Sequence, residues 1–178
     1  MKAPLFTALL LISSALPLLT APVLAQQATL PGGASALNEA HGSWTVNCTL
    51  VEAGKDCAFW QTAGNPQTGS ALVAVELAAP TGNKAEGMLL TAFGLRLDAG
   101  IQLGIDGQQL GQALPFLTCV QTGCLVPLDL DEVALSAMKV GTTLEVTGVK
   151  VDDGQPVTVP LSLAGFTAAY NRTAELAQ

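Results

Sequence analysis

The stretch TCVQTGCL, residues 118–125, places two cysteines five positions apart around a Thr-Gly pair, with apolar residues on both sides. A second pair, Cys48 and Cys57, flanks the sequence TLVEAGKD in a region that alternates between apolar and polar residues. A four-residue loop, 51–54 in this pair and 120–123 in the other, sets the two cysteines at facing positions of antiparallel strands, near the Cβ separation that a disulfide needs. The spacing therefore predicts two hairpins, each closed by a local disulfide.

Two alternatives to a disulfide exist for these thiols, a redox couple and a metal site. Neither pair is a C-x-x-C motif that opens a helix, the arrangement that lowers a thiol pKa. A zinc site would require four reduced thiolates, and the spacings match no common zinc ribbon or finger. We therefore expect no metal and two disulfides, with a redox-active Cys119 and Cys124 pair as the alternative. The residues expected in disulfides are Cys48, Cys57, Cys119 and Cys124.

The N-terminal sequence MKAPLFTALLLISSALPLLTAPVLAQQ is typical of a bacterial export signal. A single Lys2 precedes an uncharged, Leu-rich run, so we expect residues 1–25 to be a signal peptide that is cleaved after Ala25. The run approaches the roughly 20 residues of a membrane-spanning helix, but Pro17 and Pro22 break its second half and no basic cluster follows. No transmembrane segment is expected after cleavage. An even number of cysteines in an exported chain also favours disulfides.

The charge of the chain argues against a nucleic-acid partner. Fourteen acidic residues stand against seven basic ones, for a formal net charge of −7. Binding to phosphates needs clustered Lys and Arg, whereas the basic residues of this chain are scattered. The excess of acidic residues keeps an exported protein soluble.

The body of the chain consists of short runs rich in Val, Leu and Thr, separated by signals such as GNPQTG, APTGN and DDGQP. Strands that recur at this spacing are typical of an antiparallel sandwich or barrel. We therefore predict an all-β fold, a disulfide-stapled antiparallel β-sandwich or barrel-like domain with one or two short helices. Beyond the first hairpin, the expected strands are 70–77, 87–93, 101–106, 114–120, 124–128, 143–151 and 156–163.

Two segments predict helices. In DLDEVALSAMKVG, Asp129 and Glu132 fit a capping box, helix formers follow and Gly141 is a stop signal, so a helix is expected at about 130–140. The sequence GFTAAYNRTAEL near the C-terminus predicts a second, shorter helix that frays at its tip.

The domain organisation predicted from these signals is simple. Residues 26–42 carry no periodic pattern and are expected to be a flexible leader. Residues 43–178 show no internal repeat and no linker, and we expect them to form a single β domain.

The motifs W-x-V-x-C, C-x-x-x-Q, PF-x-TC-x-x-x-GCL and VPLSLAGF follow one another between about residues 43 and 170. With these motifs in this order, the chain resembles the invasion-associated locus B family of bacterial exported proteins. The resemblance implies a mainly β fold and a periplasmic, secreted or outer-surface location, and members in some pathogens are linked to virulence through entry into host cells. The chain carries Phe93 and Gly94 where relatives tend to show a proline-containing turn, so we expect that loop to be built differently.

No residue pattern predicts a catalytic site or a cofactor. The resemblance brings no catalytic residues, because the shared positions are cysteines, glycines, prolines and core apolar residues. The single histidine, His41, lies next to the expected leader. The densest acidic group, Asp129, Asp131 and Glu132, is interpreted as helix capping, since it lacks the alternating oxygen donors of a calcium loop.

The two tryptophans are the candidate interaction residues. Trp44 and Trp60 lie at opposite ends of the first hairpin, and packing into the core is the favoured interpretation for both. The alternative is that an exposed tryptophan anchors a partner, because aromatic side chains dominate interface hot spots. The phenylalanines Phe93, Phe116 and Phe166 are interpreted as core residues.

The hypothesis that follows is an exported, non-enzymatic protein of the bacterial envelope or surface that binds a protein or envelope component through loops or an open sheet edge. The alternative is a periplasmic redox protein or accessory enzyme that uses Cys119 and Cys124.

Overall fold

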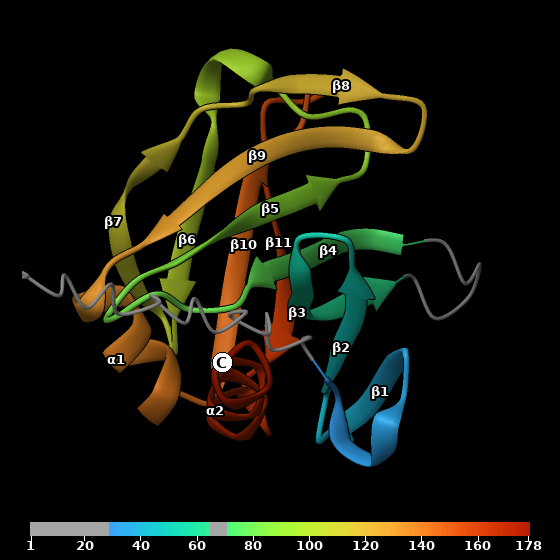
Figure 1. Cartoon of the computed structure of the whole chain (residues 1–178). Coiled ribbons are helices and arrows are strands. Elements are labelled where there is room, and N and C mark those ends of the chain that lie inside the picture. Colours follow the sequence, from blue (N-terminus) through green and yellow to red (C-terminus); the bar gives the residue numbers. More distant parts are fainter. Residues whose placement is uncertain (1–28, 65–70) are drawn as a thin grey trace, which may run out of the picture.

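The computed structural model describes residues 29–64 and 71–178, which form two antiparallel sheets and two α-helices (Figure 1). The larger sheet has the strand order β1-β2-β3-β4-β5-β9-β8, and the smaller sheet has the order β11-β10-β6-β7. The predicted fold class, a mainly antiparallel β fold with two short helices and two disulfides, is confirmed.

The strands of the larger sheet are β1 (Ala36–His41), β2 (Trp44–Val51), β3 (Gly54–Gly64), β4 (Ala71–Ala78), β5 (Ala85–Thr91), β8 (Thr118–Val120) and β9 (Gly123–Leu130). Those of the smaller sheet are β6 (Ile101–Ile105), β7 (Gln108–Leu114), β10 (Thr143–Val149) and β11 (Pro156–Ser162). The helices are α1 (Glu132–Val140) and α2 (Phe166–Leu176), with short 3₁₀ turns η1 (Pro31–Gly33) and η2 (Leu97–Ala99).

Both cysteine hairpins have the register that the spacing predicts. Cys48 pairs across β2 and β3 with Cys57, and Cys119 pairs across β8 and β9 with Cys124. The residues expected at the loop ends also pair with each other, so the strands run further into the turn than the four-residue loops imply.

Strand β1 overturns part of the predicted flexible leader. It pairs with β2 along its whole length, and Leu37, Glu39 and His41 are half-buried. The sequence ALNEAH contains a single large apolar residue, and the helix that covers it lies 133 positions later, as measured from Glu39 to Arg172. A local pattern therefore could not show this strand. The predicted signal peptide, residues 1–25, lies outside the described residues.

The strand predicted at 114–120 has the wrong bounds, since only 118–120 form a strand of their own. Strand β7 ends at Leu114, and Pro115, which has no N–H to donate to a ladder, separates it from the three-residue strand β8. The sequence QQLGQAL of β7 is mostly polar and contains Gly111, so it does not show the apolar alternation of a half-buried strand.

The helices differ from the prediction in their details. The cap of α1 is Asp131, whose carboxylate accepts a hydrogen bond from the Ala134 N–H at 2.8 Å, whereas Asp129 lies in β9. The predicted capping box is therefore wrong. Helix α2 has eleven residues against nine in α1, and Leu176 in its last turn is buried, so it is the longer helix.

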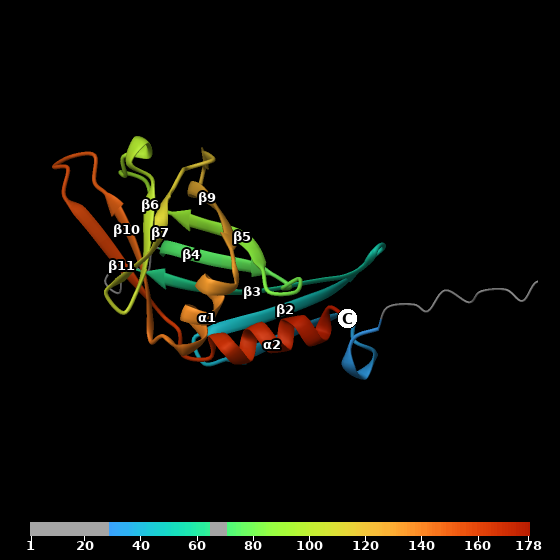
Figure 2. The same ribbon diagram turned by 90° about the vertical axis from the view of Figure 1, so that its left-hand side faces the viewer.

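Helix α2 packs against the inner face of β1, β2 and β3, as Figure 2 shows. Its buried residues recur at helical spacing, and Phe166 and Tyr170 join the buried rings of Trp44 and Phe59 at centroid distances of 5.1 to 6.3 Å. Gly165 begins the helix at φ 89°, where an added Cβ would overlap the His41 carbonyl. The close approach requires glycine and seats the start of α2 against the turn between β1 and β2.

The two sheets are joined where β3 approaches β11. The Gln61 amide donates to the Ser162 carbonyl at 2.7 Å and accepts from the Ser162 N–H at 3.1 Å. The Trp44 indole N–H donates to the same carbonyl at 3.1 Å. Because Gln61 satisfies both backbone groups at the end of β11, these three residues close the sandwich at this end.

Candidate functional site

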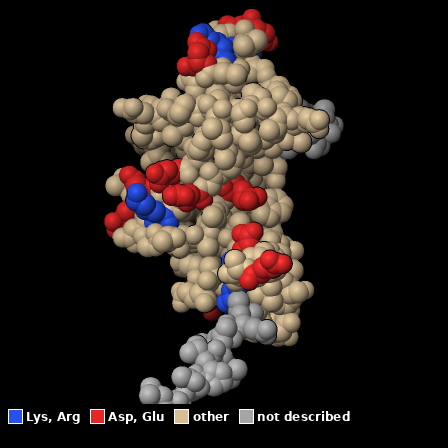
Figure 3. Space-filling model, turned by 45° about the horizontal axis from the view of Figure 1, so that its top comes forward, with Lys and Arg blue, Asp and Glu red and all other residues tan. Residues whose placement is uncertain are grey.

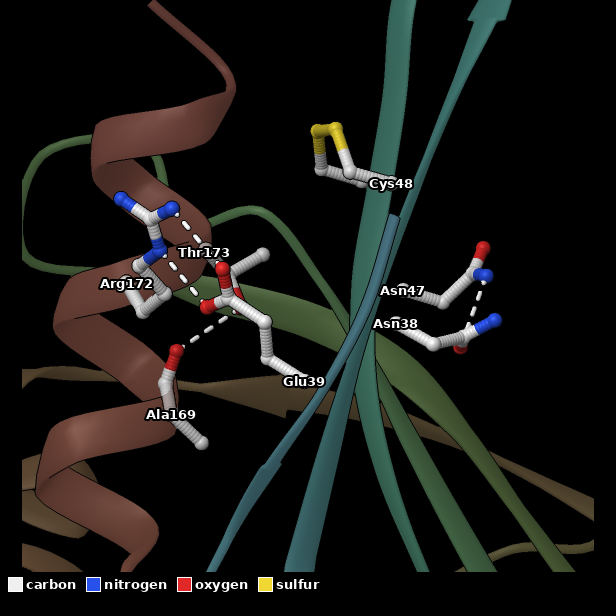
Figure 4. Close-up of a disulfide and its surroundings, with 8 residues drawn as sticks. Asn38, Glu39, Asn47, Cys48, Ala169, Arg172 and Thr173 are labelled. Carbon is white, nitrogen blue, oxygen red and sulfur yellow. Dashed lines mark hydrogen bonds and ion pairs between the residues drawn. A yellow bond between two sulfur atoms is a disulfide. The ribbon is translucent and has the colours of Figure 1, made fainter. Parts of the chain in front are cut away.

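The disulfides occupy different settings in the larger sheet. Cys48–Cys57 is buried beneath α2, and Figure 4 shows it on the sheet beside Glu39 and Arg172. Cys119–Cys124 joins β9 to β8, the last strand of the sheet, and there Cys119 is exposed. All four cysteines are paired in the structure.

The two candidate interaction residues, Trp44 and Trp60, differ in burial and lie on opposite faces of the sheet. Trp44 is fully buried in the aromatic cluster, so the structure contradicts an interaction role for it: its ring contacts Phe59 and Phe166, and its indole N–H is bonded to Ser162. Trp60 is 40% exposed and points to the opposite face of the sheet. The two residues are sixteen positions apart, an even number, but the hairpin turn between them places their side chains on opposite faces.

A shallow hollow of about 280 Å³ surrounds Trp60 on the outer face of the larger sheet. In the strand register, Trp60 lies opposite Glu76, and Glu76 lies opposite Met88. The next row contains Ala74, whose short side chain leaves space between the longer ones. The residues around the hollow are Trp60, Ala74, Val75, Glu76, Met88, Leu90, Thr122 and Leu125.

The composition of this hollow suits an apolar contact with one charge at its side. Met88, Leu90 and Leu125 are half-buried on the outer face, and Glu76 is the only charged residue among the described residues around the hollow. An exposed tryptophan beside a flexible methionine is typical of surfaces that accept a partner's side chains. On the face of the molecule that Figure 3 shows, the charged side chains stand in small groups, and a broad uncharged surface lies between these groups.

The single histidine belongs to an ion-pair cluster between β1 and α2. Arg172 donates to both carboxylate oxygens of Glu39, at 2.7 and 2.9 Å (Figure 4), and to Glu175 at 3.0 Å. The guanidinium holds the pKa of Glu39 below its ordinary value, and the carboxylate in turn raises the pKa of Arg172. His41 Nε2 lies 3.3 Å from a Glu39 oxygen. The cluster links β1 to α2, and we therefore interpret its role as structural.

The acidic group at the start of α1 is dispersed. Asp131 caps the helix, Glu132 is in its first turn, and Asp129 is exposed on β9. Among residues 29–64 and 71–178, no group of three or more His, Cys, Asp or Glu side chains is arranged to hold a metal ion.

A second and larger cavity lies between the sheets, and the sequence did not indicate it. Its volume is about 410 Å³, and its walls come from β4, β5, β6, β10 and β11. Phe93, interpreted from the sequence as a core residue, is 60% exposed at this cavity, so that interpretation is wrong. The missed signal is the apolar AFGL between β5 and β6, which lies over a gap that the two sheets leave open.

Comparison with known proteins assigns the family. The sequence profile of the invasion associated locus B (IalB) proteins matches residues 44–174. The chain belongs to this family. An invasion protein B homologue of Brucella abortus (strain 2308) is 41% identical over 145 residues, which cover 82% of this chain and 83% of the relative. Invasion protein B of Bartonella bacilliformis is 30% identical over 151 residues, with 84% and 81% covered.

A solved structure supports the assignment to the IalB family. The crystal structure of invasion associated protein B from Bartonella henselae matches with a TM-score of 0.73 at 27% identity, and the match covers 79% of this chain and 96% of that one. The family resemblance inferred from the cysteine motifs is therefore confirmed. None of the helices in the described part of the chain is long and apolar enough to cross a membrane.

Proposed function

We propose that this IalB-family chain is an exported, non-enzymatic protein-interaction module that binds a protein partner on the outer face of its larger sheet, around Trp60. The observation that carries the proposal is the exposed Trp60 in a row of outer-face residues that has no helix over it in the described structure. Interface hot spots are enriched in tryptophan and cluster in pockets rimmed by less critical contacts.

The proposed partner presents an apolar side chain next to a basic one. The hollow accepts the apolar group between Trp60, Met88 and Leu90, and Glu76 provides a negative charge at its side. A positive charge on the partner would favour encounter and fix the orientation more than it would add affinity.

Export is supported by the disulfides and by the N-terminal sequence. Disulfides form and persist in oxidising compartments outside the cytosol, and this chain has two of them. Fractionation of the producing bacterium, with N-terminal sequencing of the protein, tests this step. Recovery from the periplasm or medium with Gln26 as the first residue is the expected result, and an uncleaved chain in the cytosol contradicts it.

Photo-crosslinking tests the interaction surface. A photoreactive amino acid replaces Thr122, an exposed residue beside the hollow, in one variant and Val133, an exposed apolar residue on α1, in the other, so that Trp60 itself is kept. We expect a discrete crosslinked partner from position 122 alone, identified by mass spectrometry. Trp60→Ala should then weaken binding of the purified partner by about 30-fold or more, the effect of a hot-spot residue, while Val133→Ala leaves it unchanged. Equal crosslinking from both positions contradicts the proposal.

A redox role for the second disulfide is the other candidate function, and the exposure of Cys119 favours it. Thiol titration of the denatured, unreduced protein separates the two candidates. No free thiol and resistance to mild reductant support the interaction module, whereas ready reduction and reoxidation of Cys119 and Cys124 support the redox role.

A further inference from the structure

The two sheets are joined at the end of β11 and leave a cavity between β4 and β11 further along. Gln61 and Trp44 hold the end of β11 at Ser162, and Figure 2 shows β10 and β11 leaning away from β4 and β5. The space between them, about 410 Å³, is within the range of small-molecule sites, roughly 300–1,000 Å³.

The walls of this cavity are aliphatic. Both sheets turn branched side chains into it, including Val73 from β4 and Val159 from β11. The residues around the cavity are Leu72, Val73, Thr91, Ala92, Phe93, Gly94, Leu95, Ile101, Val146, Gly148, Lys150, Val151, Asp152, Val157 and Val159.

The interior offers a ligand no free hydrogen-bonding side chain. The Thr91 hydroxyl already donates to the Cys124 carbonyl at 3.4 Å. Throughout the described residues, no buried side-chain nitrogen or oxygen lacks a partner. A polar ligand group placed inside would lose its bonds to water without replacement, which costs several kcal/mol at the upper end of measured values. The inner part of a ligand is therefore apolar.

The rim adds exposed apolar residues and a single cation. Phe93 and Val151 are more than half exposed there. Lys150 is the only positively charged residue among the described residues around the cavity. Its ammonium pairs with Asp153, and Asp152 lies beside it. Exposed ion pairs contribute little to stability, so an anionic group on a ligand can replace Asp153 as the partner of Lys150 at little cost.

The neighbouring edge of β11 is a poor site for a partner strand that would fill the gap. The Leu163 N–H, just after β11, donates to the Thr142 carbonyl, on the side of β10. In an antiparallel pair, the backbone groups of successive residues point alternately toward the partner strand and away from it. Those of Pro156, Thr158 and Pro160 therefore point away from β10. Two of these three have no N–H, which disfavours strand addition. A small ligand fits the gap better than a peptide strand.

We propose that this cavity binds the aliphatic chain of a fatty-acid-like amphiphile, whose carboxylate pairs with Lys150 at the rim. The aliphatic walls accept the chain, Phe93 and Val151 cover its outer part, and the ammonium neutralises its head. This site is separate from the Trp60 hollow, which lies on the opposite face of the larger sheet, so either site can fail experimentally without the other.

Calorimetric titration of the purified, disulfide-intact chain tests the site with three single-chain probes below their micelle concentrations: dodecanoate, dodecanol and dodecyltrimethylammonium. We expect one molecule of dodecanoate per chain, and an affinity that rises about three- to fourfold per added methylene in a series of shorter carboxylates until the cavity is full. Dodecyltrimethylammonium should bind most weakly. Binding without a chain-length dependence overturns the proposal.

Three variants locate the binding. Val157→Trp fills the cavity from the exposed edge strand and should weaken dodecanoate binding at least tenfold, whereas the matched Val140→Trp, on the exposed face of α1, should not. Phe93→Ala, in the loop, serves as a second cavity variant should Val157→Trp unfold, and it should also weaken binding. Lys150→Met should weaken dodecanoate by up to about fivefold, the worth of an exposed ion pair, and leave dodecanol unchanged.

Each possible outcome of these titrations either supports the proposed site or overturns it. Loss of dodecanoate binding in the cavity variants, with a carboxylate-specific effect of Lys150→Met, supports the proposal. Absent binding, equal binding in all variants, or an equal effect of Lys150→Met on dodecanoate and dodecanol overturns it. Circular dichroism of each variant confirms that the comparison is between folded proteins.

Discussion

The β2–β3 hairpin and the β8–β9 hairpin carry the same local chemistry in different surroundings. In each, two cysteines at facing positions close a short turn with a disulfide. The first hairpin has β1 on one side, β4 on the other and α2 across its inner face, whereas β8 is the last strand of its sheet (Figure 1). The cysteine spacing thus determines a register, while the neighbouring strands and helix determine how much the hairpin contributes to stability.

Removal of the tryptophan buried beneath α2 should have the largest effect. Trp44→Ala deletes a fully buried ring that contacts Phe59 and Phe166 and donates to Ser162. We expect the free energy of unfolding to fall by about 3–5 kcal/mol, measured by urea denaturation. Trp60→Ala, on the outer face of the same hairpin, is the control and should lose no more than about 1 kcal/mol, the span of residue preferences in strands. A similar loss in both variants would mean that the outer face of the sheet is covered in solution.

Removing the two disulfides separately compares the hairpins directly. Cys48→Ala with Cys57→Ala should cost roughly 2–3 kcal/mol, because it removes the cross-link from a buried site. Cys119→Ala with Cys124→Ala should cost about 1 kcal/mol and leave the fold intact, since its loop is shorter and β8 is free on its other side. Thermal unfolding of both variants measures the difference. Failure of the second variant to fold would show that β8 anchors the sheet in a way its exposure does not suggest.

The link from the first hairpin to the smaller sheet should have a somewhat smaller effect. Gln61→Leu keeps the volume but leaves the Ser162 N–H without its partner and the Ser162 carbonyl with the Trp44 indole alone, so a loss of about 1–2 kcal/mol is expected. Gln121→Leu, in the exposed turn of the second hairpin, is the matched control and should have little effect. Hydrogen exchange adds a local test, because faster exchange at Ser162 in Gln61→Leu is expected only if this side chain holds the end of β11.

Local patterns in the sequence were sufficient to predict the cysteine hairpins and most of the strands. Facing cysteines around a short turn require one register, and most strands appear within a few residues of their predicted positions because their apolar residues alternate. The family followed from the same cysteine motifs and their spacing. Each of these features depends on residues that are near one another in the chain.

The features that the sequence did not show depend on distant partners. Strand β1 contacts Arg172 on α2, far along the chain. Phe93 is exposed because the sheets diverge above it, and a phenylalanine in an apolar run is ordinarily a core residue. Trp44 and Trp60 are both aromatic residues in one hairpin, and only the position of α2 decides which of them is buried. The candidate sites therefore depend on packing between sheets, which no local pattern encodes.

The smallest expected effect concerns the strand that gives the first hairpin its additional neighbour. Glu39 anchors β1 to α2 through Arg172, and this contact lowers the pKa of the Glu39 carboxyl below its ordinary value near 4.5. A carboxyl whose pKa is lower in the folded state stabilises the fold above its unfolded pKa and loses that contribution as the pH falls through the folded pKa. The stabilisation from this pair should therefore be complete near neutral pH and decline below about pH 4.5.

Thermal unfolding of the parent and of Glu39→Gln between pH 7 and pH 3 measures this contribution. Near pH 7 the parent should melt at a higher temperature than Glu39→Gln. This difference in melting temperature should be smaller than for the preceding variants that lower stability, because the pair is partly exposed and screened by solvent. As the pH falls, the parent's carboxyl becomes neutral like the glutamine amide, so the two melting curves should converge. Glu175→Gln, which leaves both bonds between Arg172 and Glu39 in place, should show less of this pH dependence. A difference that stays constant down to pH 3 would mean that Glu39 orders β1 by its packing rather than by its charge, and the first hairpin would then owe its additional strand to apolar contacts alone.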